Sequence, residues 1–269
     1  MNLAGTMALI TGASQGLGAA TARTMAARGA EVLLLARSED KLRGVASEIE
    51  AAGGRARVYP VDLADLDAVV ATTDAIKAEG TIPDVIVNNA GIGRWVFIEE
   101  TPLEEMQADM AAPYFAAFAI TKAFIAEMAD RGSGNVCNIN GPGAWFPWPS
   151  SIAYASARWA LRGFSAALRV DMRDTGVTVT DVVMSKISSS YWENNPGSED
   201  RVPWVDRLVP TMTPGQAAEV VTRAVERERR EATAPFMYTV FHQTGRLFPR
   251  FVHWCVYRGG AKRPSSFGP

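Results

Sequence analysis

The amino-acid sequence predicts an α/β protein built around one doubly wound parallel sheet. Short apolar runs alternate with longer amphipathic runs from residue 7 to residue 184, and this alternation is typical of parallel strands joined by helices. A glycine-rich turn follows the first apolar run directly. No linker, repeat or shift of composition interrupts the chain, so we expect residues 1–269 to form a single domain.

The first half of the chain supplies four of the expected strands. Their apolar runs are short enough for buried strands and lie at residues 7–10, 31–36, 57–61 and 85–87. The stretches between them carry apolar side chains at helical spacing, which predicts helices at residues 15–28, 39–52 and 66–78. Gly53 and Gly54 mark the end of the second helix.

The second half continues the same alternation. Thr213 and Pro214 form an N-cap and first-turn pair, which predicts a helix to residue 228. Before that pair we expect a long helical region at residues 102–128, a fifth strand at 135–140, a helix at 154–174 and a sixth strand at 177–184.

The segment from Thr11 to Gly18, with the sequence TGASQGLG, separates the first strand from the first helix. Glycine permits a sharp turn and a close approach of ligand to backbone, and a helix N-terminus offers free N–H groups to an anion. Strand, glycine turn and helix in this order are typical of Rossmann-like folds that bind dinucleotides. The spacing G-x3-G-x-G differs from the G-x-G-x-x-G of long-chain enzymes.

The composition excludes several classes of protein. The 269 residues are 48% hydrophobic and 21% charged with a formal net charge of -2, so there is no basic footprint for nucleic acid. Two cysteines are too few for a disulfide framework, and His242 and His253 lack the neighbouring carboxylate of a metal site. We expect no metal, no signal peptide and no membrane-spanning helix, and therefore a cytoplasmic protein.

Four motifs occur in order on this framework: TGASQGLG at 11–18, Asp62-Leu63, NNAG at 88–91, and Tyr154 four residues before Arg158. Together they resemble the short-chain dehydrogenase/reductase family over roughly residues 5–190. The resemblance implies one dinucleotide-binding and catalytic domain. It implies that the cofactor is contacted at the pyrophosphate by Gly12, Ser14, Leu17 and Gly18, at the adenine by Asp62 and Leu63, from beneath by Asn89, Ala90 and Gly91, and at the nicotinamide amide by Ser189.

The residue after the second strand indicates which dinucleotide is bound. Enzymes that use NAD place an acid there to accept hydrogen bonds from the ribose hydroxyls. Here the residue is Arg37, whose guanidinium suits the additional 2′-phosphate of NADP. A solvated surface arginine is the alternative, and we expect NADP(H) as the cofactor.

The catalytic residues implied by the resemblance are Tyr154 and Arg158. Members of this family use Asn, Ser, Tyr and Lys, the last two as Tyr-x3-Lys, and residues four apart on a helix share a face. Tyr154 takes the role of general acid or base. Arg158 replaces the lysine; it keeps its charge and stabilises a tyrosinate, but it cannot release a proton near neutral pH.

Two further catalytic positions depart from the family. The Ser position, thirteen residues before Tyr154, is Gly141, and the Asn position, eight before Thr121, is Pro113. The loss of a donor to the reacting oxygen commonly costs on the order of a hundredfold in rate. The candidate substitutes for the missing hydroxyl are Asn140, Ser150 and Ser151.

The substrate is expected to be a small hydrophobic molecule. Gly141 and Pro113 leave a less polar, roomier site beside Trp145, Phe146 and Trp148, which favours a bulky apolar or aromatic compound.

Residues 185–212 break the alternation of strand and helix. Segments of this length inside a compact domain are usually lids or binding loops, so we expect a substrate loop here, with a surface excursion as the alternative. Lys186 either approaches the nicotinamide end of the site or is solvated.

The C-terminal residues 232–269 contain no Asp or Glu, and arginines alternate with aromatic side chains. This pattern suits peripheral contact with a membrane surface, with Pro249 breaking any single long helix. The alternatives are packing on the substrate loop or on a second subunit. Resemblance to the family also implies a homo-oligomer formed through the long helices.

Two functions follow from these observations. The first is an NADP(H)-dependent oxidoreductase acting on a carbonyl, an alcohol or a related C=X bond, with Tyr154 as proton donor or acceptor. The second is a cofactor-binding protein without redox turnover, either regulatory or catalysing a non-redox step, because three of the four catalytic positions are altered.

Overall fold

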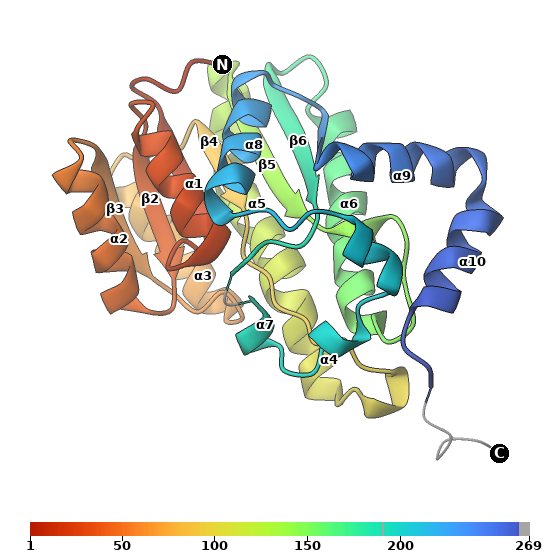
Figure 1. The fold of residues 1–269 in the computed structure, drawn as a ribbon. Helices are drawn as coiled ribbons and strands as arrows, with labels where there is room; N and C mark the ends of the chain where they lie inside the picture. Colours follow the sequence, from red (N-terminus) through yellow and green to blue (C-terminus); the bar gives the residue numbers. More distant parts are fainter. Residues whose placement is uncertain (190, 264–269) are drawn as a thin grey trace.

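Seven parallel strands form one sheet in the computed structural model, which describes residues 1–189 and 191–263 (Figure 1). Their order across the sheet is β3-β2-β1-β4-β5-β6-β7. The strands are β1 (Met7–Thr11), β2 (Glu31–Ala36), β3 (Arg55–Pro60), β4 (Val85–Asn88), β5 (Gly134–Asn140), β6 (Val177–Met184) and β7 (Glu231–Ala234). The doubly wound parallel sheet expected from the sequence is confirmed, with one strand more than the six predicted.

The additional strand, β7, lies at the edge of the sheet. It pairs with β6 in parallel, from Glu231 opposite Asp181 to Ala234 opposite Met184. Its sequence EATA is shorter and more polar than the inner strands, and only Ala234 is buried. An edge strand with so little buried apolar surface carries no clear hydrophobic pattern, which is why the sequence did not reveal it.

Helices cover both faces of the sheet. The bounds are α1 (Gly16–Ala26), α2 (Glu39–Ala51), α3 (Leu66–Ala78), α4 (Leu103–Met110), α5 (Ala116–Arg131), α6 (Ile152–Asp171), α7 (Tyr191–Asn194), α8 (Pro214–Glu226), α9 (Phe236–Leu247) and α10 (Pro249–Gly259). Successive residues of β1 point to opposite faces: Ile10 packs in the core beneath α1, α2 and α8, and Leu9 packs in the core beneath α3, α5 and α6.

A single π-helical turn, Ala111–Phe115, separates α4 from α5. The sequence predicted one long helical region here. Pro113 lies buried within this turn and has no backbone N–H to donate to the preceding turn of an α-helix. The helix is therefore interrupted at the proline, as expected for that residue type.

The N-terminus of α8 confirms the predicted cap. The Thr213 hydroxyl accepts a hydrogen bond from the Gln216 N–H at 3.2 Å, and the Gln216 side chain accepts one from the Thr213 N–H at 3.0 Å. This reciprocal arrangement satisfies two N–H groups that the helix leaves unpaired.

The chain ends in two helices, α9 and α10, at the edge of the molecule farthest from α2 and β3 (Figure 1). Pro249 is the first residue of α10, so the proline separates the two helices as predicted. Residues 264–269 of the predicted basic and aromatic segment lie outside the described residues. Among the helices that are described, none combines the length and the apolar character needed to cross a membrane.

Candidate active site

A cavity of about 990 Å³ opens at the carboxyl ends of the strands. Its walls come from the ends of the inner strands, from the segment 185–209, and from α9 and α10. Ligands of doubly wound sheets bind at this edge, where the strand order reverses between β1 and β4. The cofactor-binding and catalytic residues proposed from the sequence all line this cavity, whereas Trp145, which was expected beside the site, does not: the lining includes Gly12, Ser14, Leu17, Gly18, Arg37, Asp62, Leu63, Asn89, Ala90, Gly91, Tyr154, Arg158 and Ser189.

The glycine turn packs closely against the end of β4. Gly12 has a φ of +66°, and a Cβ atom there would lie 2.9 Å from the Asn89 side-chain nitrogen. A Cβ atom on Gly18 would lie 2.2 Å from the Gly12 carbonyl oxygen. Gln15, the N-cap of α1, makes no side-chain capping hydrogen bond. The first turn of α1 is therefore open to an anionic ligand, and only glycine fits at positions 12 and 18.

Thr11 joins the ends of β1 and β4 beneath this turn. Its hydroxyl accepts hydrogen bonds from the N–H groups of Asn89 at 2.9 Å and of Ala90 at 3.0 Å. The Asn89 side chain donates to the Thr11 carbonyl oxygen at 2.8 Å. These bonds fix the NNAG segment against the glycine turn.

Two cations lie where β2 ends. Arg37 is exposed and lines the cavity, and Lys41, on the first turn of α2, lines it as well. The Lys41 ammonium donates to the Gln15 side chain at 3.2 Å, so it lies beside the glycine turn. The sequence indicated Arg37 but not Lys41, because the proximity of Lys41 depends on how α2 packs beside α1. The glycine cradle and the two cations fit a dinucleotide with an additional phosphate, as NADP(H) has.

The ring of Tyr154 lies in a slot between glycines. A Cβ atom on Gly141 would lie 2.2 Å from the Tyr154 hydroxyl oxygen, and one on Gly143 would lie 2.7 Å from the ring. On the other side, a Cβ atom on Gly93 would lie 3.0 Å from the ring. The phenol oxygen thus occupies the space into which a side chain at position 141 would project.

Arg158, one helical turn after Tyr154, lies against the same ring. Its guanidinium carbon is 5.2 Å from the ring centroid, and Nη1 donates to the Ile139 carbonyl oxygen at 3.1 Å. A Cβ atom on Gly91 would lie 2.4 Å from Nη2, so the glycine makes room for the guanidinium. Burial raises the pKa of the Tyr154 hydroxyl above its usual value, and the Arg158 charge opposes that shift without cancelling it.

Of the three residues considered as substitutes for the missing serine hydroxyl, only Asn140 lines the cavity. Its side-chain nitrogen donates to Asp181 at 3.2 Å, and its side-chain oxygen is buried without a hydrogen-bond partner. Ser151 donates its hydroxyl to the Trp148 carbonyl oxygen at 2.7 Å. The Ser150 hydroxyl is buried without a partner and lies outside the cavity lining.

Asp109, near the end of α4, is a buried acid that the sequence did not single out. It lines the cavity, it is 2% exposed, and its Oδ2 atom has no hydrogen-bond partner. Burial and the neighbouring Glu105 carboxylate raise the pKa of Asp109 to about 6, although the charges of Arg158 and Arg94 oppose the shift. Buried ionisable groups with such shifts gather at functional sites.

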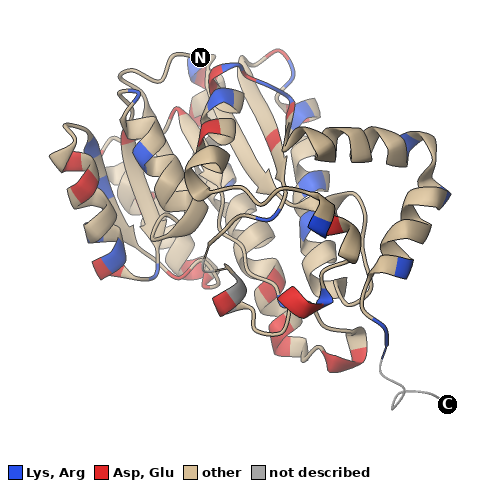
Figure 2. Cartoon of the chain, viewed as in Figure 1, with Lys and Arg blue, Asp and Glu red and all other residues tan. Residues whose placement is uncertain are grey.

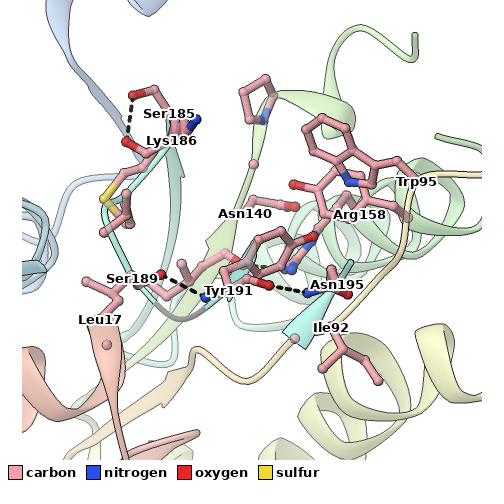
Figure 3. Close-up of a pocket in the computed structure, with 18 of the residues that line it drawn as sticks. Leu17, Ile92, Trp95, Asn140, Arg158, Ser185, Lys186, Ser189, Tyr191 and Asn195 are labelled. Atoms are coloured by element: carbon pink, nitrogen blue, oxygen red, sulfur yellow. Dashed lines mark hydrogen bonds between the residues drawn. The ribbon is translucent and has the colours of Figure 1, made fainter. Parts of the chain in front are cut away.

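Ser189 lies beside the glycine turn, close to Leu17 and across the cavity from Trp95 and Arg158 (Figure 3). A Cβ atom on Gly16 would lie 3.4 Å from the Ser189 Cβ. Lys186 also lines the cavity and forms an ion pair with Glu199 at 2.5 Å.

Described residues between 185 and 209 form one wall of the cavity, and a role of this segment as a substrate loop stays a prediction. Asn195 accepts a hydrogen bond from the Gly93 N–H at 3.1 Å, and the Ser198 hydroxyl accepts one from the Trp95 N–H at 2.9 Å. The Arg201 guanidinium makes two bonds to the Glu100 carboxylate, at 2.5 and 3.0 Å. These contacts fasten the segment to the chain that follows β4.

The end of the cavity beside Tyr154 is aromatic. Trp95 and Trp148 each have ring centroids 5.7 Å from the Tyr154 ring. Side chains of α9 and α10 complete this wall, and Tyr238 donates a hydrogen bond to Asp206, which agrees with the alternative that the C-terminal segment packs on the loop at 185–212. The side chains of α9 and α10 in this wall are Met237, Tyr238, Phe241, Cys255 and Val256.

Comparisons with known proteins find relatives of this chain in sequence and in structure. Residues 6–199 match the family model described as short chain dehydrogenase. The chain is 32% identical over 235 residues to a fatty acyl-CoA reductase of Acinetobacter baylyi, covering 86% of this chain and 77% of the relative. It is 33% identical over 242 residues to an uncharacterised oxidoreductase of Mycobacterium tuberculosis, covering 86% and 67%. A metagenomic short-chain oxidoreductase in complex with NADP superimposes with a TM-score of 0.72 at 30% identity, covering 87% of this chain and 98% of that one.

Proposed function

The chain belongs to the short-chain dehydrogenase/reductase family, and on that premise we propose that it is an NADP(H)-dependent oxidoreductase. Its substrate is a bulky apolar or aromatic carbonyl compound, or the corresponding alcohol. The observation that carries this proposal is the buried Tyr154 phenol, held in a slot of glycines against Arg158 at the aromatic end of the cavity.

The cofactor site follows from the residues at the strand ends. The first turn of α1 receives the pyrophosphate, and Arg37 with Lys41 receives the 2′-phosphate. The related metagenomic oxidoreductase has NADP bound, which supports the same cofactor here. When bound, NADPH supplies the hydride that a carbonyl reduction requires.

Tyr154 supplies the proton. In reduction its hydroxyl donates to the substrate oxygen as charge develops there, and in oxidation the phenolate removes the proton from the alcohol. Arg158 stabilises the phenolate by its positive charge. This electrostatic stabilisation is stronger in a buried site of low dielectric than in water. Arg158 does not pass a proton onward, because the guanidinium stays charged at neutral pH.

The substrate class follows from the wall of the cavity around Tyr154. Trp95, Trp148 and Phe241 offer aromatic surface, and no hydroxyl at position 141 binds a polar group. A relative that is named for reduction of fatty acyl-CoA supports a large apolar substrate. We expect weak activity on small ketones.

The experiment is a panel of hydrophobic and small carbonyl compounds assayed by oxidation of NADPH. We expect turnover with bulky members and a loss of at least about a hundredfold in Tyr154→Phe. Tyr257→Phe, which removes a hydroxyl from an exposed ring on α10, is the matched control. Undiminished turnover in Tyr154→Phe, or none on any member by the wild type, contradicts the proposal.

The second candidate is a cofactor-binding protein without redox turnover. It is favoured by Gly141, which leaves no hydroxyl for the reacting oxygen, and by Arg158 in place of lysine. Binding of NADPH with no turnover on any carbonyl would support it. A serine at position 141 would not restore the family's arrangement in this chain, because its Cβ would meet the Tyr154 hydroxyl.

We also propose that the protein acts as a homo-oligomer in the cytoplasm. Exposed aromatic rings on α5 and α6, Phe118 and Trp159, support self-association. Cys137 and Cys255 are both free thiols, which suits a reducing compartment.

A further inference from the structure

The outer faces of α9 and α10 present a row of exposed apolar side chains, which we call the C-terminal elbow. A soluble monomer rarely exposes so many large apolar side chains together. The exposed fractions are 77% for Phe236, 50% for Val240, 74% for Leu247, 62% for Phe248, 59% for Phe251, 56% for Trp254 and 71% for Tyr257.

These exposed apolar side chains lie next to one another and form a continuous patch. Phe236, Val240 and Leu247 are spaced four and seven residues apart, so they lie along one side of α9. The rings of Phe251 and Trp254 on α10 stack with centroids 6.5 Å apart. Leu247 and Phe248 lie at the corner between the helices, at the edge of the molecule (Figure 1).

The charged side chains on α9 and α10 all have one sign, although Glu231 of β7 lies 3.6 Å from the Nδ1 atom of His242 on α9. Figure 2 shows basic and no acidic residues on α9 and α10. Within the described part of the chain, no carboxylate lies within ion-pair distance of Arg246, Arg250, Arg258 or Lys262. Arg263 differs, because it pairs with Glu99 at 2.6 Å. The elbow therefore combines exposed apolar rings with uncompensated positive charge.

The inner faces of the same helices line the cavity. Tyr238 and Val256 are buried and belong to the aromatic core around Tyr154. Tyr238 also donates a hydrogen bond to Asp206 at 2.5 Å, which joins α9 to the segment 185–212. The elbow is thus held firmly by its inner side while its outer side is left to solvent.

We propose that the C-terminal elbow docks on a lipid bilayer that contains anionic lipid. Aromatic rings and leucines enter the boundary of headgroup and acyl chain, and the arginines bind anionic headgroups. A second copy of this chain fits less well. A twofold contact through the elbow would bring the arginines of one copy (Arg246, Arg250 and Arg258) near those of the other, and α9 and α10 carry no acid to pair with them.

Docking has a consequence for the cavity that rests on the proposed function. The wall formed by Met237, Phe241 and Val256 belongs to the inner sides of α9 and α10, so it would lie about one helix diameter, roughly 10 Å, from the lipid surface. An apolar substrate that leaves the bilayer would then have a short path to the site.

The test is co-sedimentation of the full-length protein with phosphatidylcholine vesicles, with and without phosphatidylglycerol. We expect binding to the anionic vesicles that weakens as salt is added. Arg246→Gln, Arg250→Gln and Arg258→Gln combined should weaken binding roughly a hundredfold, since each basic residue near an anionic surface contributes about fivefold. A chain ending near Glu231 is unsuitable, because it would lack the edge strand β7.

The apolar contribution is tested separately. Leu247→Ser, Phe248→Ser and Phe251→Ser combined should weaken binding at least about tenfold. The matched control for the apolar variant combines Val70→Ser, Leu103→Ser and Val170→Ser, which remove exposed apolar side chains from other helices. The matched control for the arginine variant combines Arg43→Gln, Arg55→Gln and Arg173→Gln, which remove three positive charges outside the elbow. Both sets should sediment as the wild type does. Circular dichroism and thermal unfolding of each variant verify its fold.

Three results would overturn the proposal. The first is that the wild type remains in the supernatant with anionic vesicles. The second is that the elbow variants sediment as well as the wild type. Alternatively, light scattering shows an oligomer that the serine variant dissociates while vesicles bind neither protein, in which case a second copy covers the elbow. None of these results depends on enzymatic turnover, so the proposed function stands or falls separately.

Discussion

The contact between Gly141 and the Tyr154 hydroxyl makes the site sensitive to one methyl group. In Gly141→Ala the new Cβ would lie 2.2 Å from the phenol oxygen, so the ring must move. A displacement of about 1 Å in a catalytic group costs roughly a hundredfold in rate. We expect kcat to fall by that order while the Kd for NADPH is unchanged.

The control for this prediction is Gly163→Ala on α6, where a Cβ meets no atom within 4 Å. It should retain full activity. Steady-state kinetics and fluorescence titration with NADPH measure the two quantities, and a Gly141→Ala protein with wild-type kcat would show that Tyr154 is not the proton donor.

Asp109 should make the folded protein less stable as pH rises. Its pKa of about 6 in the folded state lies above the ordinary carboxyl value, so the fold holds a proton that the unfolded chain releases. Stability is therefore lost between about pH 4 and pH 6. Asp109→Asn removes this loss and should be more stable at about pH 7, on the order of 2–3 kcal/mol, with no gain near pH 4.

Denaturant unfolding at the two pH values measures this difference. Asp74→Asn, an exposed carboxylate on α3, is the control and should show no dependence of its effect on pH. An Asp109→Asn protein that is equally or less stable at neutral pH would mean that the carboxylate is paired or solvated in solution.

Residue spacing in the sequence predicted the residues around Tyr154 but not the buried carboxylate Asp109. Counting from Tyr154 located Arg158 and Gly141, which the structure brings against the ring. Asp109 stands in an acidic stretch with Glu104 and Glu105, and nothing in the sequence separates a buried carboxylate from solvated ones. Its burial arises from the packing of α4 beside α6, which is a property of the fold.

The junction of β2 and α2 should determine the choice between the two dinucleotides. Arg37 and Lys41 converge there beside the glycine turn. Arg37→Ala with Lys41→Ala should raise the Kd for NADPH at least about tenfold and leave that for NADH unchanged, because charge-assisted bonds to the 2′-phosphate are lost.

Isothermal titration with each dinucleotide measures this discrimination. Arg43→Ala, on the same helix but paired with Glu39 at its own surface, is the control. Equal weakening of NADPH and NADH would place the two cations elsewhere than at the 2′-phosphate.

Elements with a clear apolar or amphipathic pattern were predicted most closely. The observed bounds of β2, α3 and β6 agree with the predicted ones. In long apolar or amphipathic runs, the spacing of the apolar side chains distinguishes a strand from a helix clearly. β7 was missed because an edge strand of four residues buries one side chain. The break between α4 and α5 was not predicted, because the region 102–128 was expected to be one helical region; Pro113 accounts for an interruption, and the π-helical turn depends on packing that no local pattern encodes.

The molecule as a whole should self-associate through α5 and α6. Phe118 and Trp159 are about half exposed on these helices, and Phe118 packs on Phe164 with centroids 5.5 Å apart. Phe118→Lys with Trp159→Lys should shift the mass by light scattering to a smaller species, because it places charges in an apolar contact. Val70→Lys on α3 is the control, and an unchanged mass in the double variant would exclude this face.

The two indoles beside Tyr154 have one more use. Trp95 and Trp148 meet edge to face with centroids 4.6 Å apart, and both are buried at the cavity wall. Indole emission depends on the polarity around the ring, and a reduced nicotinamide absorbs light of the energy that indole emits. The protein therefore carries its own optical reporter: the arrival of dinucleotide, or of an inert apolar compound that is never converted, can be followed from ultraviolet-excited emission without a label.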